Sequence, residues 1–210
     1  MGWFDFTRAP GGTRVETLDV PIFPLNTVLF PGGVQSLKIF EQRYLDMAAA
    51  CMKEGTPFGI CLIDKGSEVG EAATPHALGT LATIVDWEME QLGILLVTTR
   101  GGRRFRIIES HASDDKLLRA KVELLPETAA VAMPPERRRL LPLLRRVVAD
   151  LGPARIPEPH DYDNALWVGY RITEVLPIQN LAKQKLLELD DPLARLEILE
   201  KFLDQRQLLG

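Results

Sequence analysis

The residue types that bind metals are few in this chain and widely separated. The histidines His76, His111 and His160 are far apart, so they lack the one-turn spacing with which two histidines of a zinc hydrolase hold their metal. Cys51 and Cys61 each lie in apolar sequence, which indicates buried free thiols rather than metal ligands or a disulfide. We therefore predict no metal site and no cysteine chemistry.

Phosphate binding and nucleophilic catalysis also lack their usual sequence patterns. A P-loop ends in Gly-Lys followed by Ser or Thr, and the chain contains no Gly-Lys pair. The few serines do not lie in a Gly-x-Ser-x-Gly elbow. The sequence therefore predicts no cofactor and no enzymatic activity.

The nearest approach to a metal cluster is the polar segment at residues 160–164, His-Asp-Tyr-Asp-Asn. It comes directly before a predicted helix, where Asp161 or Asp163 can accept hydrogen bonds from unpaired backbone N–H groups. Carboxylates at that spacing could also bind a cation. We favour capping of the helix over metal binding.

Two basic runs could contact phosphate groups. The first, at residues 100–106, contains Arg100, Arg103, Arg104 and Arg106, and strand alternation would place Arg104 and Arg106 on one face. The second, at residues 136–146, places its arginines on the polar face of a predicted helix. The formal net charge of the chain is -4, which disfavours nucleic acid as a partner. We therefore interpret both runs as solvated faces and keep RNA binding by the first run as the alternative function.

The first part of the chain, which contains the first basic run and both cysteines, is predicted to be rich in β-strands. Seven short apolar segments have the length and flanking turns of strands: residues 20–25, 37–39, 58–63, 78–85, 94–99, 105–108 and 118–124. The segment at 58–63 is apolar throughout, which is typical of a central strand covered on both faces. The set predicts a barrel or rolled sheet.

Helical periodicity appears once among these strands and then dominates the second part of the chain. A helix is predicted at 44–52, because its apolar residues recur at i, i+3, i+4 and i+7. Further helices are predicted at 140–151, 166–176, 181–189 and from Asp191-Pro192 onward, with Pro142 marking a kink or a helix start. Two prolines end the segment 127–135, which we predict to be a domain boundary.

The predicted organisation is thus a partly ordered leader at 1–17 with Trp3, Phe4 and Phe6, a β-barrel domain at 18–127, and a helical subdomain at 135–210. The fold class is α+β. No apolar run is long enough to cross a membrane and no signal sequence is evident, so we expect a cytoplasmic protein without a membrane partner.

Two segments carry a family resemblance. Residues 22–32 (IFPLNTVLFPG) and 37–44 (LKIFEQRY) resemble the opening of the N-terminal substrate-binding (LON) domain of Lon proteases, especially short bacterial proteins that consist of little else. Further similar blocks follow in order at 58–60, 68–70, 78–84, 101–107 and 118–125, and the helical tail is also similar. The chain departs from the family pattern at Gln35-Ser36 and at residues 91–93.

The resemblance implies a PUA-like rolled barrel that binds exposed, unfolded or degron-bearing segments of other proteins, alone or beside a separate ATPase or protease. The ATPase and Ser/Lys peptidase residues of Lon proteases have no matching positions in this sequence. It therefore implies a protein that binds polypeptides and is not an enzyme.

The segments that carry the resemblance also suggest where a peptide would bind. Pro21, Pro24 and Pro31 cannot donate ladder hydrogen bonds, so we expect them at edges and turns, where an extended peptide could add as a strand. The candidate peptide-binding residues are Phe30, Pro31, Phe40, Glu41, Arg43, Tyr44 and Arg104. The competing interpretation places Phe40 and Tyr44 in the core and pairs Glu41 with Arg43 or Arg104 as a structural ion pair.

Overall fold

The structure is a computed structural model that describes residues 5–8, 14–70 and 73–209, with 5–8 and 14 described by their backbone alone. It divides into two compact units, Met1–Glu127 and Thr128–Gly210. Trp3, Phe4 and the side chain of Phe6, which the sequence places in the leader, lie outside the described residues.

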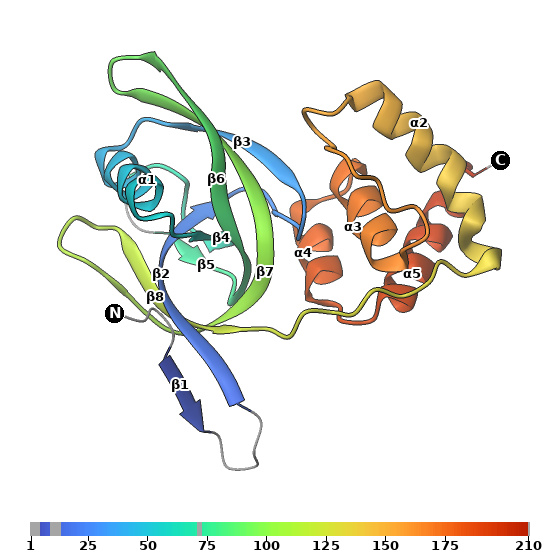
Figure 1. Cartoon of the computed structure of the whole chain (residues 1–210), viewed down its shortest axis with the longest axis horizontal. Coiled ribbons are helices and arrows are strands. Elements are labelled where there is room, and N and C mark those ends of the chain that lie inside the picture. Colours follow the sequence, from blue (N-terminus) through green and yellow to red (C-terminus); the bar gives the residue numbers. More distant parts are fainter. Residues whose placement is uncertain (1–4, 9–13, 71–72, 210) are drawn as a thin grey trace. The chain divides into compact units, whose positions relative to one another are not determined.

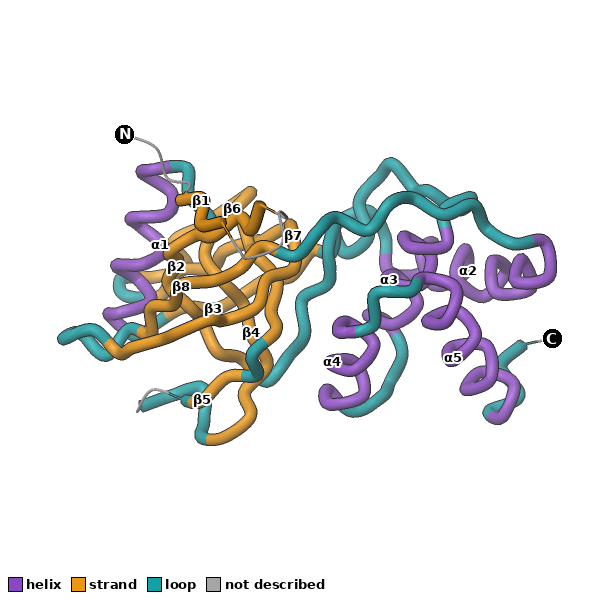
Figure 2. Tube along the Cα trace, turned by 90° about the horizontal axis from the view of Figure 1, so that it is seen from below, coloured by secondary structure: helices purple, strands orange, loops and turns teal. Residues whose placement is uncertain are grey.

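The first unit is a rolled β-sheet with one helix (Figures 1 and 2), as the sequence predicts. Its strands are β1 (Asp5–Arg8), β2 (Arg14–Leu25), β3 (Val34–Ile39), β4 (Phe58–Lys65), β5 (Thr74–Pro75), β6 (Leu78–Gln91), β7 (Ile94–Ala112) and β8 (Leu118–Leu124). They follow the order β1-β2-β8-β7-β6-β4-β5, and a parallel pairing of β2 with β4 closes the sheet into a barrel. Strand β3 pairs with β7.

The N-terminal strands extend further than the sequence indicates. Strand β2 begins at Arg14 and pairs with β1 over Asp5–Arg8, so the predicted leader at 1–17 contains two paired segments. This pairing joins segments that show no periodicity of their own. The two strands are held together by cross-strand hydrogen bonds, which depend on the partner segment and therefore cannot be predicted from local periodicity.

Strand β7 is one continuous strand of 19 residues, not the two strands that the sequence predicts. The Gly101-Gly102 pair lies at a bulge opposite β6, where the register shifts between Thr80 and Ala82. The backbone of Gly101 also bonds to Gly32 and Gly33, each N···O distance being 2.8 Å, and a Cβ on Gly101 would collide with the carbonyl oxygen of Phe30. Glycine is therefore needed for close approach of a loop, not for a turn.

Strand β2 contains two of the prolines that were expected at edges. It pairs with β8 up to Ile22 and with β4 from Ile22 to Leu25. Pro21 and Pro24 thus lie on either side of the residue where β2 changes partner, and each has a described strand along one edge only. A missing N–H donor is tolerated at such positions.

One apolar core of the first unit forms between the sheet and α1 (Gln42–Glu54), whose buried face includes Tyr44, Met47, Ala48 and Cys51, and a second forms among strand residues around Phe105. The sequence predicts this face of α1, and Gly55 ends the helix in the left-handed conformation with φ 67°. Strand β4 lies between β2 and β6 with residues 58–62 buried, which confirms its central position.

The second unit consists of helices around its own core (Figure 1). They are a 3-10 helix, η1 (Pro135–Leu140), followed by α2 (Leu141–Leu151), α3 (Ala165–Val175), α4 (Asn180–Glu188) and α5 (Pro192–Gln205). Pro142 therefore lies at the start of an α-helix rather than at a kink.

The helix caps follow the sequence in one case and differ in the other. Asp191 caps α5 as predicted, because its carboxylate accepts hydrogen bonds from the N–H groups of Leu193 and Ala194. At α3 the cap is Asn164, whose Oδ1 accepts from the N–H of Leu166 at 3.0 Å, not Asp161 or Asp163. Asp161 instead accepts a hydrogen bond from the Asn164 amide at 2.9 Å.

Candidate functional site

A groove with a cavity of about 280 Å³ lies on the first unit beside β3. Its walls come from the end of β2, from β3, from the start of α1 and from the segment after β4. The residues that line it are Phe23, Leu25, Thr27, Gln35, Ser36, Leu37, Lys38, Ile39, Phe40, Glu41, Tyr44, Glu68 and Val69. We call this cavity the β3 groove.

The edge of β3 that faces away from β7 offers backbone groups to the β3 groove. Gly101 donates to the carbonyl of Gly33, and in an antiparallel ladder bonded and non-bonded pairs alternate. Gln35, Leu37 and Ile39 therefore bond to β7, while the N–H and C=O groups of Ser36 and Lys38 point away from it. Within the described ranges no strand pairs with this second edge of β3.

The opposite wall of the β3 groove is the end of β2. After Ile22 this strand has left β8, and among the strands that the structure describes only β4 runs beside residues 23–25. The barrel thus has a gap between β2 and β3, and the lining residues Phe23 and Leu25 face β3 across it. An added strand would fit the hydrogen-bonding requirements of such a gap.

Aromatic rings form the apolar floor of the β3 groove. Phe23 and Tyr44 are buried and stacked, with ring centroids 4.0 Å apart. Phe40, which the competing interpretation places in the core beside Tyr44, is instead 54% exposed. The core interpretation of Phe40 is wrong because β3 ends at Ile39, the last residue of the strand to turn its side chain into the core.

An ion pair fixes the junction of β3 and α1. The Nη2 of Arg43 lies 3.0 Å from Oε2 of Glu41, and the Nη1 donates to the carbonyl oxygen of Lys116 at 2.9 Å. The predicted pairing of Glu41 with Arg43 is confirmed. Glu41 is also the N-cap residue of α1, where a carboxylate offsets the positive end of the helix dipole.

The pKa of Tyr44 reflects the charged residues that lie around the β3 groove. Burial is the main reason that the pKa of the Tyr44 hydroxyl is raised above its ordinary value. Arg43 acts in the opposite direction, while the carboxylates of Glu41 and Glu68 raise this pKa further. Both carboxylates therefore lie close enough to act on one phenol.

The structure separates the predicted peptide-binding residues into two groups. Phe40, Glu41 and Tyr44 line the β3 groove. Arg43 is buried and forms an ion pair with Glu41. Phe30 and Arg104 are buried and, like Pro31, do not line it. Sequence reasoning missed Phe23, Leu25, Lys38 and Glu68; the block at 68–70 carried a family resemblance, which was the available signal.

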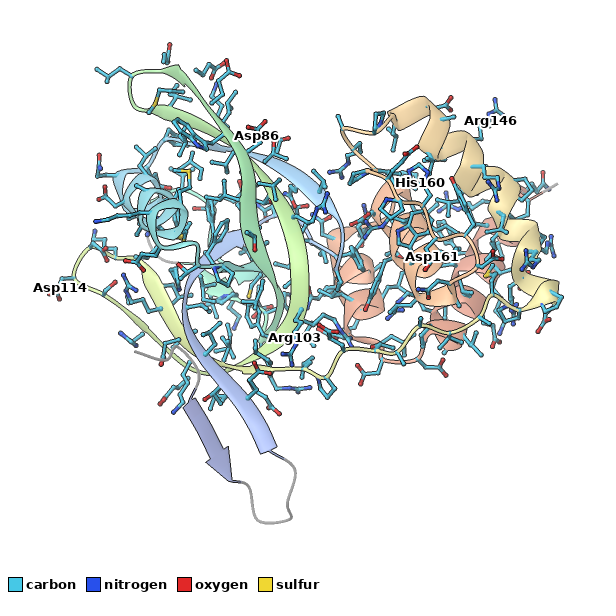
Figure 3. All side chains as sticks on the ribbon, in the orientation of Figure 1. Asp86, Arg103, Asp114, Arg146, His160 and Asp161 are labelled. Carbon is cyan, nitrogen blue, oxygen red and sulfur yellow. The ribbon has the colours of Figure 1, made fainter. Side chains whose placement is uncertain are left out.

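Two arginines of the first basic run, Arg103 and Arg104, are engaged within the barrel, while Arg100 and Arg106 are exposed. Arg104 therefore does not share a solvated face with Arg106, although strand alternation predicts that it does. Arg103 lies 2.6 Å from Glu16 and donates to the carbonyl of Leu125, and Arg104 is buried (Figure 3 labels Arg103). Arg103 and Glu16 also line a second cavity of about 430 Å³, together with Leu18, Leu81 and Leu124. With Arg103 paired and Arg104 buried, fewer cations of this run are available for phosphate, and the RNA-binding alternative is not favoured.

The second basic run is also largely paired. Arg137 contacts Glu200, Arg138 lies 2.7 Å from Asp163, Arg139 lies 2.5 Å from Asp204, and Arg145 covers the ring of Tyr162. Arg146 projects from α2 (Figure 3). In the part of the chain that the structure describes, no group of acidic, histidine or cysteine side chains is arranged to hold a metal, and no helix is long and apolar enough to cross a membrane.

Comparison with known proteins agrees with this architecture. A family model described as the ATP-dependent protease La (LON) substrate-binding domain matches residues 19–205. The chain belongs to the LON substrate-binding domain family. The crystal structure of a Lon N-terminal domain protein from Xanthomonas campestris has a TM-score of 0.73 and 35% sequence identity, covering 87% of this chain and 97% of that one.

More distant members of the LON family share the fold. The N-terminal domain of the Mycobacterium avium complex Lon protease has a TM-score of 0.59 at 23% identity, covering 89% of this chain and 96% of that one. A Lon protease of Cytophaga hutchinsonii is 25% identical over 89% of this chain. A LON peptidase N-terminal domain and RING finger protein of Schizosaccharomyces pombe is 28% identical over 98% of it. The chain spans 24% and 49% of the lengths of these two curated relatives.

Proposed function

We propose that this LON-family chain binds exposed, extended segments of other polypeptides, which add as a strand to the free edge of β3. The observation that carries the proposal is the gap in the barrel between β2 and β3. There the backbone groups of Ser36 and Lys38 point into a groove with an aromatic floor. Main-chain hydrogen bonds would give affinity, and the apolar floor would select side chains.

Phe40 has a defined place in this proposal. Its ring is exposed at the rim of the β3 groove, whereas Tyr44 and Phe23 are packed beneath it. An exposed aromatic side chain beside an unpaired strand edge costs free energy in water unless a ligand covers it. A client side chain inserted between Phe40 and the floor would bury that surface.

The proposed role is one of binding without hydrolysis. The region of similarity is the substrate-binding domain of Lon, and the described residues that line the β3 groove include no histidine or cysteine. We expect the purified protein to hydrolyse neither ATP nor casein. Turnover that a single substitution abolishes would contradict this expectation. The free thiols Cys51 and Cys61 further support a reducing, cytoplasmic setting for this role.

A proline substitution tests the use of the β3 edge. The N–H of Ser36 points away from β7, so Ser36→Pro removes a donor from the free edge without removing a β7 hydrogen bond. The probe is a fluorescein-labelled, unstructured decapeptide with one Phe in a neutral Ser/Thr background. We expect binding to weaken by about 1 to 2 kcal/mol, or five- to thirtyfold, in titration.

The matched control is Ser36→Ala, which retains the N–H and should bind the peptide as the wild type does. Backbone N-methylation of the peptide gives an independent readout. Only alternate residues of an added strand bond to β3, so methylation should weaken binding at every second position near the Phe. Equal effects at all positions, or equal binding by Ser36→Pro and Ser36→Ala, would refute strand addition.

A further inference from the structure

The charges around the β3 groove are matched in all but one place. Lys38 is the basic residue among those that line it, and its Nζ lies 2.7 Å from Oε2 of Glu90. Arg43 is buried and pairs with Glu41. Each of these cations therefore has a carboxylate partner that is already in place.

Glu68 is the exception. It lines the β3 groove and accepts a hydrogen bond from the backbone N–H of Asn26, but no lysine or arginine of the described chain forms an ion pair with it. Glu68 lies close enough to the aromatic floor that its carboxylate contributes to the raised pKa of the Tyr44 hydroxyl. A carboxylate beside an apolar floor is complementary to a ligand that carries a cationic group next to an apolar one.

We infer that the β3 groove prefers extended segments in which a lysine or arginine lies near an apolar or aromatic residue on the same face of the strand. This inference rests on the proposed function and adds the chemical class of the bound segment. Residues two apart on a strand share a face, so the basic side chain is expected two positions from the apolar one. The apolar side chain packs on Phe23 and Tyr44, and the basic side chain meets Glu68.

Two sets of three peptides, one set for each side of the Phe, test the inference. In the labelled decapeptide with one Phe, the residue two positions away is lysine, norleucine or glutamate, and the change is made in turn on either side of the Phe. On one side we expect lysine to bind roughly fivefold tighter than norleucine, and glutamate to bind more weakly than both. The difference should shrink as salt is added, because the Glu68 side chain is partly exposed.

The variant Glu68→Gln removes the charge while its side-chain oxygen can still accept from Asn26. We expect this variant to bind the three peptides of each set with nearly equal affinity. Glu88→Gln is the matched control, since Glu88 is exposed on β6 and does not line the groove. It should retain the preference for lysine.

The outcomes separate the inference from the proposed function. If the three peptides of each set bind the wild type equally well, the groove binds peptides and the preference for basic residues is refuted. If none of the peptides binds, the proposed function fails and the preference fails with it. A preference for lysine that survives in Glu68→Gln would remove Glu68 from the role assigned here.

Discussion

Arg104 and Phe40 were predicted to contact the same peptide, but their environments differ. Arg104 is 5% exposed and does not line the β3 groove, while Phe40 is 54% exposed at its rim. A buried guanidinium contributes to folding through hydrogen bonds and packing, whereas an exposed ring contributes little until a ligand covers it. The two residues therefore permit a matched comparison of stability with binding.

We predict that Arg104→Ala lowers the free energy of unfolding by about 2 kcal/mol and leaves peptide affinity per folded molecule unchanged. Phe40→Ala should do the reverse, with an unchanged melting temperature and an affinity that is about tenfold weaker. Thermal melts and peptide titrations of both variants measure the two quantities. An Arg104→Ala protein of normal stability that binds poorly would return Arg104 to the binding site.

The two thiols are predicted to be unreactive in the native protein. Burial raises the pKa of Cys51 and of Cys61 above the ordinary thiol value, and both side chains are buried. At pH 8 a chromogenic thiol reagent should therefore react with neither residue in the folded protein and with both in denaturant. Rapid reaction of one thiol without denaturant would show that its part of the core opens readily.

At the scale of elements, the barrel depends on glycines that let strands approach a buried ring. Phe105 of β7 is fully buried, and the rings and strands around it leave no room at Gly79 of β6. A Cβ at Gly79 would lie 2.5 Å from Sγ of Cys61 and 2.7 Å from Cζ of Phe105. Gly79 is therefore required because atoms of neighbouring strands occupy the space of a side chain, not because the backbone turns there.

Gly79→Ala is expected to destabilise the barrel by about 3 kcal/mol, because the backbone carbonyl of Ile60 and the Phe105 ring must shift. Gly102→Ala is the control, since the nearest atom to its Cβ is the carbonyl oxygen of Leu81 at 3.6 Å, an ordinary contact. Denaturant unfolding followed by far-UV circular dichroism measures both. Equal stabilities of the two variants would show that the β4–β6 region adjusts freely.

At the scale of the whole molecule, the connection between the two units is predicted to be the first site of proteolysis. No helix or strand covers residues 125–131, whereas from Val131 onward the chain is held by backbone bonds to Asp163 and Ala165. A protease specific for glutamate should cut first after Glu127, which is exposed. Mass spectrometry of early fragments identifies the site, and dominant early cleavage within 58–108 would argue against this boundary.

The sequence by itself determined much of this architecture. Periodicity located α1 and the helices of the second unit, and the Asp191-Pro192 pair marked the start of α5, because these signals depend on neighbours within one or two turns. The apolar segment at 58–63 indicated a central strand for the same local reason. The blocks at 22–32 and 37–44 were enough to indicate the LON family.

Only the tertiary structure decided the β3 groove. Its free edge exists because β2 leaves β8 after Ile22 while β3 pairs with β7, and both facts concern partners far apart in the chain. Hydrophobicity left open whether Phe40 lies in the core or at a binding site, since it does not reveal where a strand ends relative to the sheet around it. The resemblance at 68–70 marked Glu68 as part of the family pattern but not as part of a groove, because the role proposed for it depends on which charges lack partners once the barrel has closed.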